Sequence, residues 1–285
     1  MIDVAPLDER RLTVFVQESF KLPAFARRDL IVAWSYRFAF FSDALGLVIQ
    51  AFLFYFVGLL VDQSKLPEYG GSQVSYMEFV AIGIALAAFV QVGLGRISAA
   101  MRREQMIGTL EAILLTPTSP ATIQLGSVVY DLIYVPLRTA IFLAAIAIGF
   151  GLDFNADGLV PALLVLVAFV PFVWGLGLIS AAGTITFRGG SAGVGFGVAI
   201  MTLASGAYFP LDLLPGWLAA LAVLNPMAVA IEGMREPLLG TVSWSETVDA
   251  VLILVPLAIV SLLAGIFAFR QALRRERRLG TLGLY

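Results

Sequence analysis

The chain has 285 residues, of which 60% are hydrophobic and only 13% are charged, and its mean hydropathy is +0.93. A soluble domain is about 45–50% apolar and about 25% charged, so this composition requires lipid around much of the surface. The absence of cysteine and histidine excludes Cys/His zinc sites, disulfides and histidine-dependent triads. The net charge of −2 suggests no nucleic-acid partner.

The N-terminal segment, residues 1–37, is polar and mixed in charge, and we expect it to lie in the cytoplasm. Within it, Leu12–Lys21 places apolar side chains on one helical face and charged or amide side chains on the other. This pattern predicts an amphipathic helix lying in the membrane interface, which Pro23 ends or kinks. The alternative is an ordinary juxtamembrane anchor.

Six apolar stretches approach the length of about 20 residues that crosses a bilayer. The third is the apolar end, from Leu132 onward, of a longer helix that begins near Ala121, and the fifth is short and rich in glycine. The sequence therefore predicts an all-α integral membrane protein whose six transmembrane helices fill one domain, residues 38–270, before a basic tail, residues 271–285. The six expected spans are 38–61, 79–100, 121–150, 159–182, 192–209 and 250–269.

Basic residues orient these spans, because lysine and arginine concentrate in cytoplasmic segments. Fifteen of the 18 lie in the N-terminal segment, around the loops after the second and fourth spans, and in the tail. Only Lys65 and Arg235 fall on the other side, and Arg138 lies within a span. We therefore expect a multi-pass protein of the cell (inner or plasma) membrane with both termini in the cytoplasm.

A cytoplasmic segment, Glu104–Leu114, is too short and too polar to cross the membrane. Helical spacing gathers its apolar residues on one face, and Pro117 and Pro120 prevent its continuation. We interpret it as a short helix that offers a polar face to a cytoplasmic partner; the alternative is a surface helix packed on the bundle without a partner. The polar face consists of Glu104, Gln105, Gly108, Thr109 and Glu111.

An outer segment, Pro210–Gly240, is apolar but interrupted by prolines. Its two pieces, Leu213–Leu224 and Met227–Arg235, each reach only about half the bilayer thickness at 1.5 Å per residue. This favours a re-entrant helical hairpin before the last span, with its turns buried in protein or facing a watery cavity. The alternative is a hairpin resting on the outer surface. The residues that mark the segment are Pro210, Asp212, Pro215, Trp217, Asn225 and Pro226.

Three ionisable residues fall at membrane depth: Arg138, Asp131 and Asp43. Charges there are costly and usually face the protein interior or water. Arg138 either lines a transit path, or pairs with one of the two aspartates to lock a closed state, or simply snorkels or holds helices in register. The glycines of 175–177 and 189–197 are expected to allow close helix packing.

The chain contains no phosphate-binding G-x-x-x-x-G-K-[ST] motif, and its only lysines are Lys21 and Lys65. It therefore cannot bind ATP in a P-loop of its own. Few groups remain for general acid–base chemistry, so we expect no catalytic residues, cofactor or metal in this chain. Because a three-plus-three inverted repeat is not evident, a stand-alone ion-coupled carrier or channel is the second hypothesis rather than the first.

Taken together, four stretches resemble the membrane subunit of ABC transporters of the type-2 permease (exporter) family, and the resemblance covers nearly the whole chain. The first leads into the first span, the second follows the second span and contains Gly-Thr-Leu-Glu, and the last two lie in the outer segment. They are Arg27–Leu30 with Tyr36–Arg37, Glu104–Glu111 with Leu114–Ser119, Ser205–Asp212 with Leu214–Leu218, and Leu224–Met227.

This resemblance implies the motor that the chain lacks. Two permease subunits, identical or different, would pair with two ATPase subunits, which bind ATP and magnesium. Residues 104–111, next to Arg103, would form a coupling helix docked in a groove of the ATPase, with Leu12–Lys21 and the loop around Arg188 as secondary contacts. The outer segment would shape or seal the exit. The substrate class stays open among lipids, lipid-linked glycans or polysaccharides, drugs and peptides.

Overall fold

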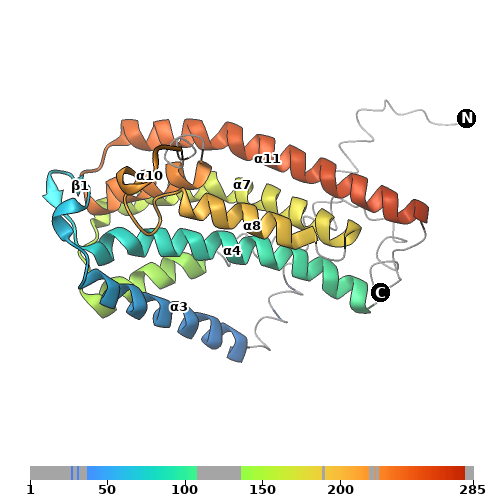
Figure 1. Cartoon of the computed structure of the whole chain (residues 1–285), viewed down its shortest axis with the longest axis horizontal. Coiled ribbons are helices and arrows are strands. Elements are labelled where there is room, and N and C mark those ends of the chain that lie inside the picture. The colour runs from blue at the N-terminus through green and yellow to red at the C-terminus, as the bar shows by residue number, and fades with distance from the viewer. Residues whose placement is uncertain are drawn as a thin grey trace, which may run out of the picture.

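A computed structural model describes residues 37–107, 136–187, 190–217 and 225–279, together with the single residues 27, 31 and 222. The described helices run along one common long direction, and a small β-hairpin lies at one end (Figure 1). Three of them are long and apolar enough to cross a membrane, and shorter apolar helices accompany them, which is consistent with the expected all-α membrane protein. The number of six spans stays a prediction.

The first described helix, α3 (Arg37–Gly58), leads to a short 3-10 helix, η1 (Gln63–Lys65), and then to the β-hairpin. Its strands, β1 (Glu68–Tyr69) and β2 (Ser72–Gln73), are antiparallel and pair Glu68 with Gln73. The turn between them is Gly70–Gly71, where φ is 59° and 74°. Positive φ at both turn positions suits the right-handed twist of a two-residue hairpin, which explains the glycine pair. We call this end of the bundle the hairpin end.

Helix α4 (Tyr76–Ile107) begins with a capping box, in which Ser75 and Glu78 exchange hydrogen bonds between side chain and backbone. Its first half is the most buried part of the bundle, since nearly every residue from Phe79 to Val90 is inaccessible. The helix then continues without a break to Ile107. This corrects the prediction of a separate helix beginning at Glu104: nothing between the second span and that residue interrupts helical hydrogen bonding.

Helix α7 (Leu159–Thr186) lies at the centre of the bundle and packs along α11 (Trp244–Leu279). A Cβ atom at Gly175 would overlap the backbone of Ser261, and one at Gly265 would approach the Gly175 carbonyl oxygen to 2.6 Å. The Ser261 hydroxyl also donates to the Phe172 carbonyl at 2.9 Å. The two backbones therefore approach through glycine, as the sequence predicted for 175–177.

Helix α8 (Gly190–Leu203) is shorter than the predicted span 192–209. The chain leaves helical geometry after Leu203, and Gly206 adopts a φ of 72° that other residues rarely take. The helix glycines were also expected to pack closely, but a Cβ atom at Gly193, Gly195 or Gly197 would have no neighbouring atom within 4 Å inside this chain. Of the two predicted glycine groups, close packing is thus found at Gly175 of α7 and not at these three glycines of α8.

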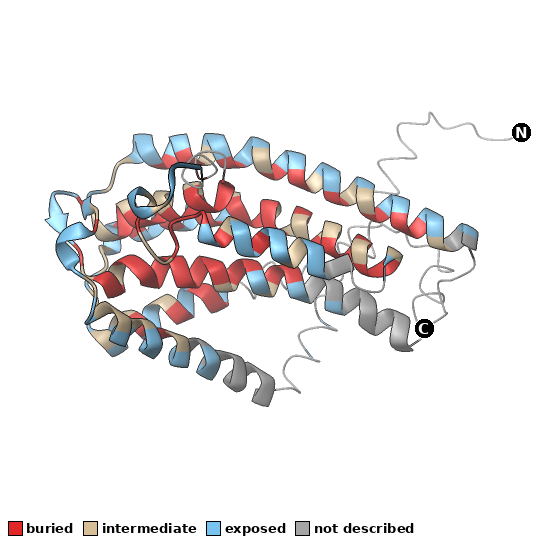
Figure 2. Ribbon diagram, viewed as in Figure 1, coloured by how far each residue is buried: buried red, intermediate tan, exposed pale blue. Residues whose placement is uncertain are grey.

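The last helix, α11, extends ten residues beyond the predicted end of the sixth span at Phe269, to Leu279. Most of the predicted basic tail is therefore the continuation of a helix. Pro256 lies within it without ending it. Many residues of α3 and α11 are exposed (Figure 2), among them the large apolar residues Phe52, Phe56, Ile259, Leu263 and Phe267. Such faces require lipid or another apolar surface.

Candidate functional site

A buried segment without helical structure, Ala204–Pro210, connects α8 to the 3-10 helix η3 (Leu211–Leu213). Ala204, Ser205 and Ala207 are almost completely inaccessible. Irregular backbone is tolerated at membrane depth only where protein or a watery cavity satisfies its polar groups. The geometry of this segment and its partners is therefore the first feature of the candidate site.

Asn225 links the end of α8, just before this segment, to the next long helix, α10 (Pro226–Leu239). Its side-chain oxygen accepts from the Met227 N–H at 3.0 Å, and its amide nitrogen donates to the Met201 carbonyl at 2.6 Å. An asparagine cap stabilises a helix by about 1 kcal/mol. Proline suits the first helical position, because the N–H that it lacks would have no partner within the helix there. The pair Asn225–Pro226 thus begins α10, as the sequence indicated, while Pro237 lies inside the helix instead of ending it.

Arg235 is the hub of the site, because its side chain is completely buried and joins three segments. Its Nε and Nη2 atoms donate to the Phe79 carbonyl of α4 at 3.1 and 2.9 Å, and Nη2 also donates to the Gly206 carbonyl at 2.9 Å. The guanidinium carbon lies 3.6 Å from the centre of the Phe79 ring, a cation–π geometry. One side chain of α10 therefore links this helix to both α4 and the irregular segment Ala204–Pro210.

A carboxylate and a phenol complete this arrangement, which we call the Arg235 hub. Glu232, one turn earlier on α10, accepts from Arg235 Nη1 at 2.7 Å, and its other oxygen accepts from the Tyr69 hydroxyl at 2.9 Å. Burial raises the pKa of the Tyr69 phenol well above its ordinary value of 10.0, so the phenol keeps its proton and donates at physiological pH. The hub therefore reaches from the β-hairpin through α10 to α4.

Close backbone contact supports the hub from the side of α4. A Cβ atom at Gly83 would overlap the Ala207 carbonyl oxygen, so only glycine allows the irregular segment to lie on this helix. At the hairpin end the segment also meets Tyr76, whose hydroxyl donates to the Tyr208 carbonyl at 2.9 Å. These contacts hold Ala204–Tyr208 against the first two turns of α4.

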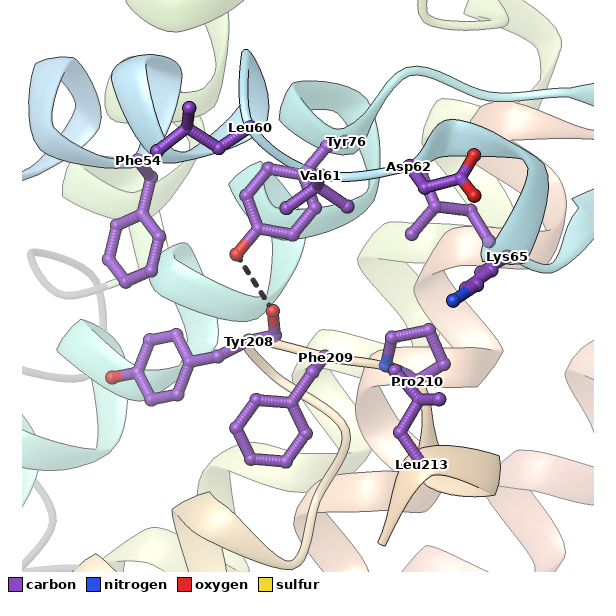
Figure 3. Close-up of a pocket in the computed structure, with 11 residues that line it drawn as sticks. Phe54, Leu60, Val61, Asp62, Lys65, Tyr76, Tyr208, Phe209, Pro210 and Leu213 are labelled. Atoms are coloured by element: carbon purple, nitrogen blue, oxygen red, sulfur yellow. Dashed lines mark hydrogen bonds between the residues drawn. The ribbon is translucent and has the colours of Figure 1, made fainter.

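A cleft of about 560 Å³ opens beside this segment, between the end of α3, η1, the start of α4 and residues 208–213 (Figure 3). The rings of Phe54 and Tyr208 stack on its inner wall with centroids 5.3 Å apart. Lys65 is its basic lining residue. The lining consists of Phe54, Leu60, Val61, Asp62, Lys65, Leu66, Tyr76, Tyr208, Phe209, Pro210 and Leu213.

Comparison with known families decides what kind of protein carries this architecture. The family described as ABC-2 type transporter matches residues 21–239, about three quarters of the chain. The chain belongs to the ABC-2 type transporter family. Among curated proteins, none matches the chain significantly. All four stretches that carried the resemblance lie within the matched residues.

Family membership makes this ABC-2 chain a permease, the multi-pass membrane component of an ABC transporter that associates with an ATP-binding subunit. Permeases of this family are generally not catalytic themselves. The expected transmembrane transport role is thereby confirmed at this level, and the resemblance to the type-2 permeases is confirmed with it.

The structure describes some of the predicted site residues of the ABC-2 chain, and the others lie outside its described part. In the outer segment, Pro210, Asn225 and Pro226 are buried at or beside the irregular segment, whereas Asp212, Pro215 and Trp217 are exposed. Arg138 is buried, with 7% of its surface exposed, in the helix Pro136–Phe150. Asp43 lies in α3, and Arg103, Glu104 and Gln105 lie in α4. Outside the described residues lie Leu12–Lys21, Gly108, Thr109, Glu111, Asp131 and Arg188.

Sequence reasoning missed the Arg235 hub. Arg235 counted only as one of two basic residues on the outer side, although it sits in an apolar stretch with Glu232 three residues earlier. That spacing places the two side chains on one helical face, and it was the available signal. The carbonyl acceptors carried no signal, because every residue has one.

Proposed function

We propose that this permease belongs to an ATP-driven exporter, in which the chain forms the translocation path and separate nucleotide-binding subunits hydrolyse ATP. Two permease subunits, identical or different, would pair in the membrane with both termini in the cytoplasm. ATP and magnesium would bind only to the partner subunits. The cargo would be a lipid, a lipid-linked glycan or polysaccharide, or a drug-like molecule.

The observation that carries this proposal is the continuity of α4. The helix joins Phe79, whose carbonyl is held by Arg235, to Glu104 and Gln105 near its other described end. At 1.5 Å per residue, Phe79 and Ile107 are about 40 Å apart along one uninterrupted helix. A displacement imposed at residues 104–111 would reach the irregular segment as a rigid-body movement, because packed helices shift as units.

In this scheme the polar segment 104–111 is the contact with the ATPase. Closure of the ATPase on ATP would displace the docked segment, α4 would carry the displacement, and the Arg235 hub would move the irregular segment with it. The outer segment would then open or reseal the exit. A stand-alone carrier gives no comparable reason for a polar segment at the far end of the same helix.

Charge reversal at Glu104 and Glu111 tests the docking contact. We expect the tagged full-length chain, isolated from its native membranes, to bring ATPase activity with it. The E104K/E111K variant should insert in equal amount but lose most of that activity or of its stimulation by transport, since a buried charge mismatch at an interface costs several kcal/mol.

The matched control reverses two exposed acids at the hairpin end, in the variant E68K/D157K, which changes the net charge equally. This variant should keep the ATPase. Normal ATP-dependent activity of E104K/E111K would remove the coupling role of 104–111, and isolation of the wild-type chain without any ATPase would refute the two-component exporter.

A further inference from the structure

The cleft at the hairpin end has a wall suited to hydrocarbon and a mouth that carries a charge. Its apolar lining continues onto the exposed end of α3 and the turn after it, where Phe56, Leu59 and Leu60 are 61%, 68% and 88% exposed. An acyl chain lying along α3 could thus enter the cleft without crossing a polar rim. Burial of each methylene group against such a wall contributes about 0.8 kcal/mol.

Lys65 is the distinctive charge at the mouth. In the described part of the hairpin end it is the exposed basic residue, because Arg235 is fully buried and engaged by carbonyls and Glu232. Figure 3 shows its ammonium directed toward the Tyr208–Pro210 wall. The other exposed charges of this end are acidic: Asp62, which also lines the cleft, and Glu68, Asp153, Asp157, Asp212 and Glu246. An anion approaching this end is therefore attracted at Lys65 and repelled by the acidic groups, of which Asp62 lies beside the lysine.

Asp62, the acidic lining residue, is committed to the turn beside Lys65. Its Oδ1 atom accepts from both the backbone N–H and the hydroxyl of Ser64, at 3.2 and 2.7 Å, as the cap of η1. In Figure 3 its carboxylate points away from the aromatic wall. The lysine, rather than the aspartate, is thus presented to an occupant.

From this charge and shape we propose that the cleft binds an anionic phospholipid of the adjoining leaflet, with its head group on the Lys65 ammonium and an acyl chain against Phe54, Phe209 and Leu213. Zwitterionic lipids of equal chain length bind more weakly, because they gain the apolar contact without the net charge interaction. The bound lipid would contact both the end of α3 and residues 208–213, and would thereby hold these two parts of the chain together. This site goes beyond the exporter proposal and does not depend on an ATPase.

Lipid retention by the full-length chain tests the site, using native mass spectrometry with phosphatidylglycerol and phosphatidylcholine of identical acyl chains. We expect wild type to prefer phosphatidylglycerol about fivefold, the scale of one lysine acting on an anionic lipid. K65Q should lower this ratio to about one, and K65R should keep it. Because only the permease is present, the outcome is independent of whether 104–111 docks an ATPase.

Two matched variants separate a defined site from general charge attraction. K65Q/T241K restores the net charge at Thr241, which is exposed at the hairpin end but does not line the cleft, and it should not restore the preference. Leu213 is 61% exposed on the opposite wall, so L213E should lower phosphatidylglycerol retention while L213Q keeps it. Preference retained by K65Q, or regained by K65Q/T241K, would overturn the proposal.

Discussion

Replacing Arg235 with alanine is expected to destabilise the folded chain by about 2–6 kcal/mol, because two buried carbonyls lose a donor at about 1–3 kcal/mol each. The substitution leaves the carbonyls of Phe79 and Gly206 without their donor and Glu232 without its cation. It also removes the cation from the Phe79 ring. A loss of this size should lower the melting temperature by roughly 10 °C in a chain of this length.

Three further variants identify the cause. R235M keeps most of the side-chain volume, so a loss close to that of R235A would assign the effect to unpaired polar groups rather than to a cavity. R235K keeps the charge, but an ammonium lacks the planar fork that reaches two carbonyls at once, so its loss should be intermediate. R270A, on an exposed position of α11, should stay within about 0.5 kcal/mol of wild type.

The measurement is thermal unfolding of purified protein in detergent, followed by circular dichroism at 222 nm, together with the yield of monodisperse protein. If R235A is too unstable to purify, R235K still gives a graded result. An R235A melting curve that superimposes on the wild-type and R270A curves would show that the hub does not hold the bundle together.

Substituting Gly83 with alanine is expected to have the second-largest effect, because the added methyl group would overlap the Ala207 carbonyl oxygen. That oxygen belongs to buried backbone, so the irregular segment itself must move away from α4. Overpacking typically costs about 1–3 kcal/mol, and displacement of the segment should also lengthen the Arg235 hydrogen bond to Gly206. We therefore expect G83A to lose both stability and transport.

Gly95 offers a matched control on the same helix, because a Cβ atom there has no neighbour within 4 Å inside the chain. G95A should be neutral, or more stable by up to about 1 kcal/mol through helix propensity alone. The double variant G83A/R235A should lose less than the sum of the single losses, since both act on the same segment. Strict additivity, or equal behaviour of G83A and G95A, would contradict the contact.

Much of the helical architecture was predictable, because apolar length and proline or glycine punctuation are local properties. The observed starts of α4, α7 and α11 lie within six residues of the predicted starts at 79, 159 and 250. Their ends agree less well: polarity after Gly95 and Phe269 marks departure from an apolar environment, not from helical geometry. α4 and α11 continue as polar helices because nothing in Arg96–Ile107 or Arg270–Leu279 opposes helix formation.

The outer segment was predictable only in part. Asn225–Pro226 carries a capping signal in its own residue types, and the structure has α10 begin there. The Arg235 hub depends instead on Tyr69, Phe79, Gly206 and Glu232, which lie up to 163 residues apart along the chain. Two of its acceptors are backbone carbonyls whose position follows from the fold. Nothing in the composition of those positions distinguishes them before the chain has folded.

The side of the membrane on which residues 104–111 lie is the central claim, and cysteine labelling measures it directly. The chain has no cysteine, so T109C and S72C each provide a single reactive thiol. In intact cells, a membrane-impermeant maleimide should label S72C on the hairpin and leave T109C unlabelled until the membrane is permeabilised. Labelling of T109C from outside would contradict the account, because no ATP-driven partner could then reach the segment.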